Sequence, residues 1–303
     1  GRRAARIAGM TIDSTARASR PPTPLEQLAP VSAQTASLDL MRLATWNINS
    51  IRARVDRAVA FLERSGTDVL ALQETKCKDT QFPFAAFEAA GYEVAHFGLS
   101  QWNGVAIISR VGLEDVSLGF PDQPQFGEEP VVEARAIGAT CGGVRVWSLY
   151  VPHGRALDNP HYAYKLDWLS TLRSHAAGWV EADPAAKIAL VGDWNVAPRD
   201  TDVWDMAVFE GQTHVSQPER DAFAAFETAG FTEVSREFVP EDRKYTYWDY
   251  QQLRFPKNQG LRIDFAYTSP ALTSAVTAVE IDRDERKGKG ASDHVPVIVD
   301  IAD

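Results

Sequence analysis

From Met41 to the C-terminus, short apolar runs alternate with turns and with stretches of helical periodicity, and this alternation restricts the fold more than any other feature. Buried strands are predicted for runs rich in β-branched and aromatic residues, namely "MRLATWNI", "TDVLALQET", "GVAIISR", "VEARAIGAT", "VRVWSLYVP", "KIALVGDWN", "LRIDFAYTS", "TAVEIDRDE" and "VPVIVDI". "FEAAGYEVAHF" is also predicted to be mostly strand. Apolar residues recur at helical spacing in 54–66, 161–181 and 219–230. The pattern predicts an α/β protein in which helices lie outside packed sheets.

The chain is expected to contain one folded domain, preceded by a different kind of segment. No repeat of fixed period and no Pro/Gly/Ser linker divides residues 41–303. Residues 1–40 contain five arginines and the run "RPPTP", with no periodic apolar face before Leu38. This composition predicts a disordered leader or a remnant of cloning, and it also resembles a transit peptide.

Composition excludes several classes of protein. The formal net charge is −10, and residues 1–40 contribute +2, so the remainder carries −12. Such a domain does not bind nucleic acid through a general basic coat, and a polyanion would need a local patch or a metal. No stretch reaches the roughly 18 to 20 apolar residues of a membrane helix. Cys77 and Cys141 lack any disulfide or zinc pattern, which favours a cytoplasmic location.

Polar side chains collect where the predicted strands end. The stretch "LVGDWNVAPRD" is an apolar strand in which Gly192 allows a tight exit before the polar residues. The strand ends carry Asn47, Asn49, Glu74, Tyr150, His153, Asp193, Asn195, Asp264, Asp293 and His294. Each has an ordinary alternative as a turn residue, a helix cap or a surface hydrogen bond. Together they indicate a hydrolytic site built on loops above a rigid sheet.

These residue types suit one kind of chemistry. Oxygen ligands such as Asn47, Glu74 and Asp293 favour a hard cation, Mg²⁺ or Mn²⁺, over zinc. A held aspartate can position and deprotonate water, while a histidine oriented by an aspartate can bind or protonate a phosphoryl oxygen. A divalent metal stabilises the leaving oxyanion. Phosphodiester hydrolysis uses all of these parts.

Eight motifs in order also carry a family resemblance. They are "TWNINSIRAR", "LALQETK", "WNGVAIISR", "YVPHG", "GDWN", "YTYWDY", "LRIDF" and "SDHVP", and they span essentially all of residues 41–303. The chain resembles the exonuclease III family of abasic-site endonucleases, within the endonuclease/exonuclease/phosphatase superfamily. "GDWN" or "SDH" alone would suit DNase I-like nucleases, sphingomyelinases or inositol-phosphate phosphatases, whereas "QETK", "NGVAI" and the "YTYWDY…LRIDF" block favour the DNA-repair branch.

The resemblance implies a four-layer α/β/β/α sandwich of the DNase I type. It also implies Mg²⁺-dependent cleavage of duplex DNA 5′ to an abasic site, with 3′-phosphodiesterase and 3′→5′ exonuclease activity. Glu74 and Asp293 would hold the metal, with Asn47 beside them. The catalytic residues implied are Asp193 as the base for water, Asn195 orienting Asp193 or the phosphate, Tyr150 on the scissile phosphate, and His294 paired with Asp264.

The resemblance also implies a substrate-binding set, with one departure. Asn103, His153, Tyr247, Trp248 and Leu261 would contact the substrate, and His153 stands where Asn or Gln is expected. Together with Ile263, the aromatic and aliphatic members would hold an extruded sugar without its base; alternatively, Trp248 is a core residue. A local positive patch is expected from Arg254, Lys257, Arg262 and "RDERKGKG" at 283–290.

Other functions remain open at this point. A lipid or inositol phosphodiesterase of the same superfamily would keep the site and change its rim. A DNA-binding module without activity would lack site residues, and none is missing here. The expected partner is double-stranded DNA with abasic sites or blocked 3′ ends, the expected state is a monomer, and no membrane association is expected.

Overall fold

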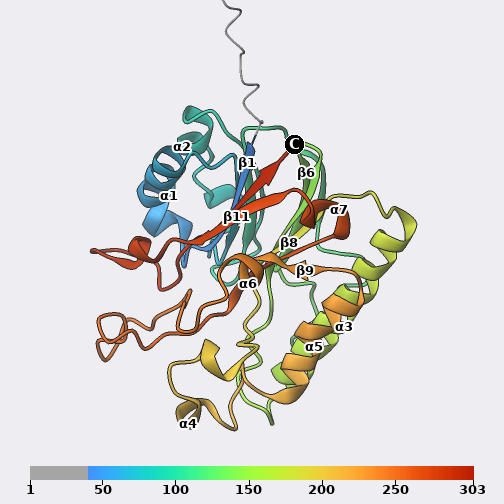
Figure 1. Ribbon diagram of the computed structural model, residues 1–303. Coiled ribbons are helices and arrows are strands. Elements are labelled where there is room, and N and C mark those ends of the chain that lie inside the picture. Colours follow the sequence, from blue (N-terminus) through green and yellow to red (C-terminus); the bar gives the residue numbers. More distant parts are fainter. Residues whose placement is uncertain (1–39) are drawn as a thin grey trace, which may run out of the picture. The chain divides into compact units, whose positions relative to one another are not determined.

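A computed structural model describes residues 40–303, which form two six-stranded sheets with helices along their outer faces (Figure 1). The prediction made for residues 1–40 therefore lies outside the described residues, apart from Leu40. Among residues 40–303, no helix is both long and apolar enough to cross a membrane.

The first sheet has the strand order β11-β12-β1-β2-β4-β3. Only β1 and β2 pair in parallel, because α1 (Ile51–Ser65) crosses between them, and the other pairs are antiparallel. The strands are β1 (Leu40–Asn47), β2 (Val69–Gln73), β3 (Glu93–Phe97), β4 (Val105–Ser109), β11 (Val276–Ile281) and β12 (Val297–Ala302).

The second sheet repeats this arrangement in the order β5-β6-β7-β8-β10-β9. Its parallel pair is β7 and β8, joined by α3 (Pro160–Ala182). The strands are β5 (Glu114–Leu118), β6 (Ala136–Cys141), β7 (Val144–Tyr150), β8 (Ile188–Asp193), β9 (Thr232–Glu233) and β10 (Asp264–Thr268).

Alternation along the strands separates the layers. In β1, Leu43 joins the core between the two sheets, whereas Ala44 and Trp46 join the core beneath α1. In β8, Ala189 and Val191 face the other sheet, and Leu190 faces the helices. This period of two is what a strand buried on both faces requires. The predicted four-layer sandwich is confirmed.

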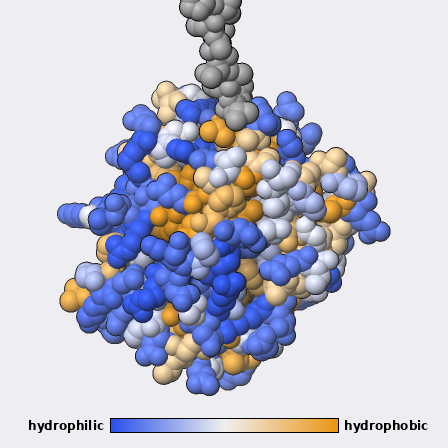
Figure 2. All heavy atoms as spheres, in the orientation of Figure 1, coloured by the Kyte–Doolittle hydropathy of each residue, from blue (hydrophilic) through white to orange (hydrophobic). Residues whose placement is uncertain are grey.

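The remaining helices are short except for one. α5 (Gln217–Thr228) packs beside α3 on the outer face of the second sheet, and both run along one side of Figure 1. The others are α2 (Phe84–Ala89), α4 (Met206–Phe209), α6 (Val234–Phe238) and α7 (Pro270–Thr273). Figure 2 shows a mostly hydrophilic surface in this orientation, with apolar side chains gathered in its upper centre.

Three features differ from the sequence predictions. The start of "FEAAGYEVAHF" belongs to α2, because Phe84 and Phe87 are spaced to put both rings on one side of a helix, against Phe82. The edge strand β5 was not predicted, since four of its five residues are exposed and two of them are charged. Helix α1 begins three residues earlier than the periodicity indicated, where the Ser50 hydroxyl accepts a hydrogen bond from the Ala53 amide.

Candidate active site

Gly192 shapes the end of β8 by allowing close approach rather than a tight exit. A Cβ at this position would lie 1.9 Å from the Leu149 carbonyl oxygen of β7, and the residue has φ +155. Only glycine lets the two parallel strands stay paired here. The predicted exit turn is therefore wrong, because Gly192 remains inside β8 and Asp193 is the last residue of the strand.

Asp193 is held by amides from both sheets. The Asn47 Nδ2 atom, at the end of β1, donates to Asp193 Oδ2 at 2.9 Å. The Asn195 backbone N–H donates to Asp193 Oδ1 at 3.0 Å, and the Asn195 side chain donates to the Val151 carbonyl at 2.8 Å. Asp193 is 2% exposed, so these bonds fix the orientation of a buried carboxylate.

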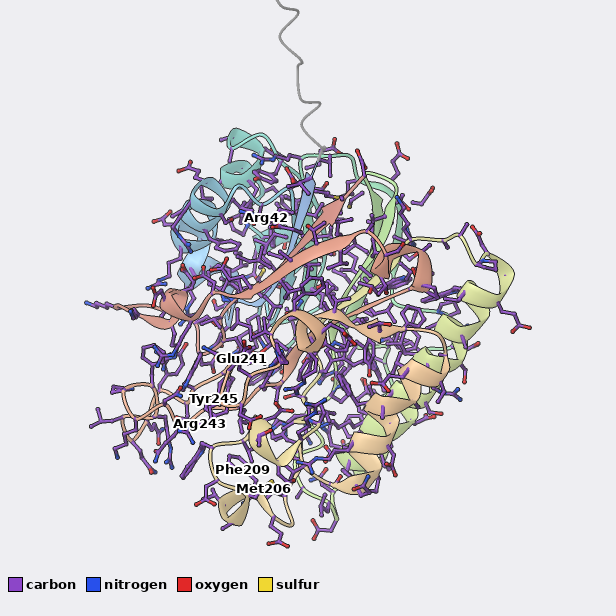
Figure 3. The ribbon with its side chains drawn as sticks, in the orientation of Figure 1. Arg42, Met206, Phe209, Glu241, Arg243 and Tyr245 are labelled. Carbon is purple, nitrogen blue, oxygen red and sulfur yellow. The ribbon has the colours of Figure 1, made fainter. Side chains whose placement is uncertain are left out.

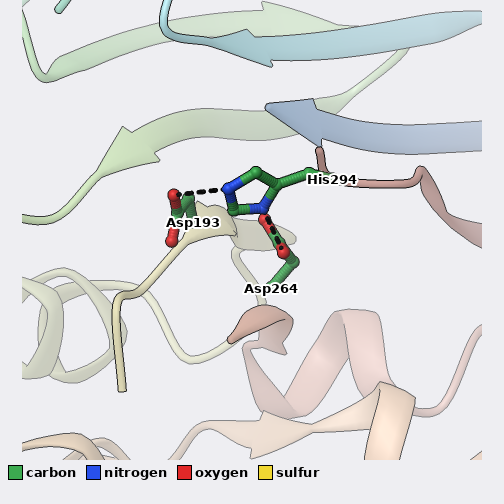
Figure 4. Close-up of side chains that lie close together, drawn as sticks. All are labelled: Asp193, Asp264 and His294. Carbon is green, nitrogen blue, oxygen red and sulfur yellow. Dashed lines mark hydrogen bonds and ion pairs between the residues drawn. The ribbon is translucent and has the colours of Figure 1, made fainter. Parts of the chain in front are cut away.

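His294, which precedes β12 of the first sheet, contacts two aspartates of the second sheet (Figure 4). Its Nδ1–H donates to Asp264 Oδ2 at 2.8 Å, and its Nε2 lies 3.6 Å from Asp193 Oδ2. Asp264 is the first residue of β10 and pairs directly with Asp193 of β8 in the ladder. His294 precedes β12, so residues distant in sequence meet at one edge of the two sheets.

The electrostatics of this group follow from burial and from its charges. The two aspartates outweigh the desolvation of the ring and raise the pKa of His294 to about 10. Burial, opposed by the His294 charge, raises the pKa of Asp193 to about 7. A protonated imidazole can therefore face a carboxylate that exchanges its proton near neutral pH.

Glu74 and Asp293 supply further oxygens at the same edge. Tyr150 donates its hydroxyl hydrogen bond to Glu74 Oε1, and Lys76 Nζ lies 3.9 Å from Glu74 Oε2. The Asp293 Oδ1 atom is buried and has no hydrogen-bond partner among residues 40–303. A buried carboxylate oxygen without a partner is costly unless a cation satisfies it. Oxygen donors of this kind fit a hard divalent cation.

A tighter group could also hold a metal. Asp193, Asp264 and His294 each offer one ligand atom, and these atoms lie within 4.8 Å of one another. Asp264 Oδ2 and Asp193 Oδ2 already face His294, but Asp264 Oδ1 is buried without a hydrogen-bond partner among residues 40–303, as Asp293 Oδ1 is. The described residues therefore contain an acidic group that could hold a metal, and Glu74 and Asp293 add carboxylate oxygens to the same cavity.

These side chains open onto a cavity of about 420 Å³. Of the residues predicted for the site, its lining includes Glu74, Tyr150, His153, Asp193, Asn195, Tyr247, Leu261, Asp293 and His294. Asn47 and Asp264 are fully buried and do not line the cavity. Asn47 is hydrogen-bonded to Asp193, and Asp264 is hydrogen-bonded to His294.

Three predicted surface or substrate-contact residues lie elsewhere. Asn103 is half-buried beside Glu133, to which its amide donates at 3.4 Å, and it is not among the cavity lining. Trp248 is fully buried and donates to Asn258 Oδ1 at 3.1 Å. It is therefore a core residue behind the cavity wall, in agreement with the alternative prediction. Arg262 is 1% exposed and donates to the Val239 carbonyl, so the expectation that it contributes to a positive surface patch is wrong.

Sequence reasoning missed part of the cavity wall. His214, Trp204 and Phe209 line it from the irregular segment between β8 and α5, and Figure 3 shows Met206 and Phe209 on the α4 segment. This segment has no period that would predict which side chains face inward. The only available signal was the histidine itself, in "GQTHVSQ".

Comparison with known proteins identifies the family. The sequence model of the endonuclease/exonuclease/phosphatase family matches residues 44–294. The chain belongs to this family. Exodeoxyribonuclease III of Haemophilus influenzae is 28% identical over 268 residues, covering 85% of this chain and 98% of that protein.

Solved structures of the family agree with the sequence match. The 3′ phosphatase NExo from Neisseria, solved with a product DNA hairpin, has a TM-score of 0.81 and 35% identity, covering 86% of this chain and 99% of that chain. An AP endonuclease from Archaeoglobus fulgidus has a TM-score of 0.79 and 33% identity, covering 87% of this chain and 99% of that chain. The predicted membership of the exonuclease III group within this family is confirmed.

Proposed function

We propose that this nuclease hydrolyses the phosphodiester bond 5′ to abasic sites in duplex DNA, with 3′-phosphodiesterase and 3′→5′ exonuclease activity. The observation that carries the proposal is the buried Asp193, which two amides and an imidazolium hold at the floor of the cavity. The repair nucleases among the relatives support the choice of DNA as substrate.

Glu74 and Asp293 would hold Mg²⁺, with Mn²⁺ as an alternative, and Asn47 beside them. When bound, the cation would neutralise charge on a phosphate oxygen and on the leaving oxygen. Asp293 Oδ1, buried and without a partner among residues 40–303, supports this ligand set. The Tyr150 hydroxyl, which donates to Glu74 in this structure, would donate to the scissile phosphate.

Asp193 would take a proton from the attacking water, and His294 would donate hydrogen bonds to the phosphoryl oxygen. The fully buried Asp264 carboxylate accepts a hydrogen bond from His294 Nδ1, and its negative charge favours the protonated form of His294. Asn195 sets the angle of the Asp193 carboxylate through its backbone N–H. These roles follow from position: water between Asp193 and a phosphorus atom near His294 would be aligned for attack.

The extruded abasic sugar would pack against the apolar wall of the cavity, formed by Tyr247, Leu261 and Ile263. The Tyr247 ring lies 5.0 Å from the His294 ring, centroid to centroid, so sugar and phosphate would be bound side by side. Arg155 and Arg254 also line the cavity and would face the DNA backbone. Action as a cytoplasmic monomer is part of the proposal.

The test is incubation with a labelled duplex that contains one tetrahydrofuran abasic analogue, with Mg²⁺ or with EDTA, beside an undamaged duplex. A metal-dependent nick 5′ to the analogue is the expected result. If folded protein with metal gives no nick, and instead cleaves sphingomyelin or an inositol phosphate, the proposed substrate is wrong.

A further inference from the structure

A second group of polar side chains lies behind Glu74, in the first sheet and outside the cavity. Thr75 follows Glu74, His96 belongs to β3, and Asp79 begins the short helical turn Asp79–Gln81. Thr75 and the His96 ring are fully buried. None of the three is among the cavity lining, and the proposed mechanism does not use them. We call these three residues the Thr75 cluster.

The backbone that carries the Glu74 carboxylate has an unfavourable conformation. Glu74 has a φ of 51° and Lys76 has a φ of 54°, both in the left-handed region that residues with a Cβ rarely adopt. Such a turn persists only where its surroundings hold it. Thr75 stands between the two residues, so its contacts decide whether the turn keeps its shape.

Backbone hydrogen bonds join this turn to two neighbouring loops. The Ser50 N–H donates to the Glu74 carbonyl at 2.8 Å, and the Thr75 N–H donates to the Gly104 carbonyl at 3.1 Å. Ser50 and Gly104 are left-handed as well, with φ of 81° and 94°. These two bonds therefore connect strained segments to one another, and a contact with a regular element would hold the turn more firmly.

The Thr75 side chain provides such a contact. Its Oγ1 atom is hydrogen-bonded to His96 Nε2 at 2.8 Å, and His96 pairs with Ala106 in the ladder between β3 and β4. A Cβ on Gly104 would overlap Thr75 Oγ1, so only glycine lets the loop before β4 pass over this bond. The Thr75 hydroxyl is thus enclosed between a loop and a strand.

Two side chains fix the His96 ring. Phe82 packs against it with ring centroids 4.6 Å apart. Asp79 Oδ1 lies 2.8 Å from His96 Nδ1, which is close enough for electrostatic attraction although it is outside the geometry of a directed hydrogen bond. Burial lowers the pKa of His96 against the opposing charge of Asp79, so the ring is neutral near pH 7. A neutral ring with its proton on Nδ1, toward Asp79, leaves Nε2 to accept from the Thr75 hydroxyl.

We propose that the Thr75 cluster holds Glu74 in its left-handed conformation and thereby sets the affinity of the site for a divalent cation. This inference rests on the proposed function, because it takes Glu74 as a ligand of the cation. A carboxylate whose backbone is already fixed loses less freedom on binding a metal. Breaking the bond between Thr75 and His96 should therefore weaken metal binding and leave the chemical step at Asp193 nearly unchanged.

The test measures binding of Mn²⁺ to the DNA-free protein by electron paramagnetic resonance, with Mn²⁺ itself as the probe. Thr75→Val removes the hydroxyl and keeps the size of the side chain, whereas Thr75→Ser keeps the hydroxyl. His96→Phe removes Nε2 and keeps an aromatic ring in the same place. Tyr92→Phe is the matched control, because it removes a buried hydroxyl that donates to the Thr67 carbonyl at the other end of β3.

Thr75→Val and His96→Phe should each raise the dissociation constant for Mn²⁺ about tenfold, the lower end of the range for residues that support a metal ligand. The double variant should bind no more weakly than either single variant, because both changes break the same bond. Thr75→Ser and Tyr92→Phe should stay close to the wild-type value. In activity assays of Thr75→Val, the half-saturating Mg²⁺ concentration should rise by the same factor, while kcat at saturating Mg²⁺ stays close to that of the wild type.

Amide hydrogen exchange in the metal-free protein gives a second readout. The Thr75 and Lys76 N–H groups donate to carbonyls of residues 103–104 at 3.1 and 2.9 Å, and both should exchange faster in Thr75→Val than in the wild type. In Tyr92→Phe they should exchange as in the wild type. Unchanged exchange in folded Thr75→Val, like an unchanged dissociation constant for Mn²⁺, overturns the inference.

Glu74→Gln separates this inference from the proposed function. If Glu74→Gln weakens Mn²⁺ binding and Thr75→Val does not, the inference fails alone. If both weaken it but the wild-type chain does not nick the abasic duplex, the proposed substrate fails alone. If Glu74→Gln binds Mn²⁺ as tightly as the wild type, Glu74 is not a ligand, and the ligand assignment and the inference fail together. Where neither Thr75→Val nor His96→Phe folds, Asp79→Ala decides by the same measurement, since the Asp79 side chain is 56% exposed.

Discussion

The two sheets have the same plan but end in different chemistry. Each has one parallel pair joined by a long helix, β1 and β2 in the first sheet and β7 and β8 in the second. At the carboxyl ends of these pairs, the first sheet supplies Asn47 and Glu74, and the second supplies Tyr150 and Asp193. The ends of the parallel pairs thus carry an amide and a carboxylate in the first sheet, and a phenol and a carboxylate in the second.

The difference lies in what surrounds each carboxylate. Glu74 is half-buried and lies close to Lys76. Asp293, which precedes β12 of the same sheet, has an Oδ1 atom without a hydrogen-bond partner among residues 40–303. Asp193 is buried and is hydrogen-bonded on both oxygens. An open, oxygen-rich environment suits a cation, whereas a closed environment suits a proton whose affinity is set by burial. In the proposed function, the carboxylate that follows β2 would therefore serve metal binding, and the carboxylate that ends β8 would serve acid–base chemistry.

The largest effect is expected from Asp193→Asn. The amide cannot accept a proton from water, so kcat should fall by about 10³-fold, within the usual range for a general base. Affinity for Mg²⁺, followed by isothermal titration, should stay close to that of the wild type if the metal belongs to the first sheet. Asp122→Asn, at an exposed site on the molecule's surface, is the matched control. A kcat within roughly threefold of the wild-type value would reject Asp193 as the base.

Glu74→Gln should give the opposite pattern. Removing a ligand charge should reduce activity at low Mg²⁺ by about 100-fold, and higher Mg²⁺ or Mn²⁺ should restore part of it, because the loss is in metal affinity. Titration of activity against Mg²⁺ for this variant and for Asp193→Asn separates the two sheets' tasks. If additional metal restores the activity of Asp193→Asn and does not restore that of Glu74→Gln, Asp193 is the metal ligand and Glu74 is the base.

The positions of these residues could largely be predicted from the sequence, because they follow apolar runs that are recognisable strands, whereas their separate roles came from the family resemblance. Asp193 and Glu74 each come directly after or at the end of such a run, so their meeting at one edge follows from the packing of two sheets. His214 could not be found in this way, since its segment has no period and His153, whose ring it contacts, lies far away in the chain. Trp248 and Arg262 misled for a related reason: burial in an irregular loop depends on tertiary contacts that single-residue preferences do not encode.

The pH dependence tests how one sheet tunes the other. Because burial raises the pKa of Asp193 to about 7, this base is protonated below that pH and kcat/KM should fall about tenfold per pH unit there. A bound cation would move this limb to lower pH. The hydrogen bond from Asn47 of the first sheet favours the charged carboxylate, so Asn47→Ala should move the limb to higher pH. If the acidic limb of the kcat/KM profile stays at the same pH in Asn47→Ala, the hydrogen bond from Asn47 does not affect the pKa of Asp193.

The smallest effect should come from the polar link between the sheets. Gln73, the last residue of β2, donates to the Ser148 hydroxyl of β7 at 3.0 Å, and Ser148 in turn donates to the Leu72 carbonyl at 2.8 Å. Ser148→Ala removes both bonds in a fully buried place and should reduce the free energy of unfolding by about 1 to 3 kcal/mol.

For this variant, denaturant unfolding measures the loss of stability, and kcat/KM should change by less than about threefold because the strand ends keep their own hydrogen bonds. Thr140→Ala, half-buried on β6, is the control for a lost hydroxyl away from this link. The contrary outcome is that Ser148→Ala lowers kcat/KM as much as a substitution of a site residue does. In that case the spacing of the sheets, rather than the side chains at their ends, sets the geometry between Glu74 and Asp193. The comparison of the two sheets would then have to begin from their packing.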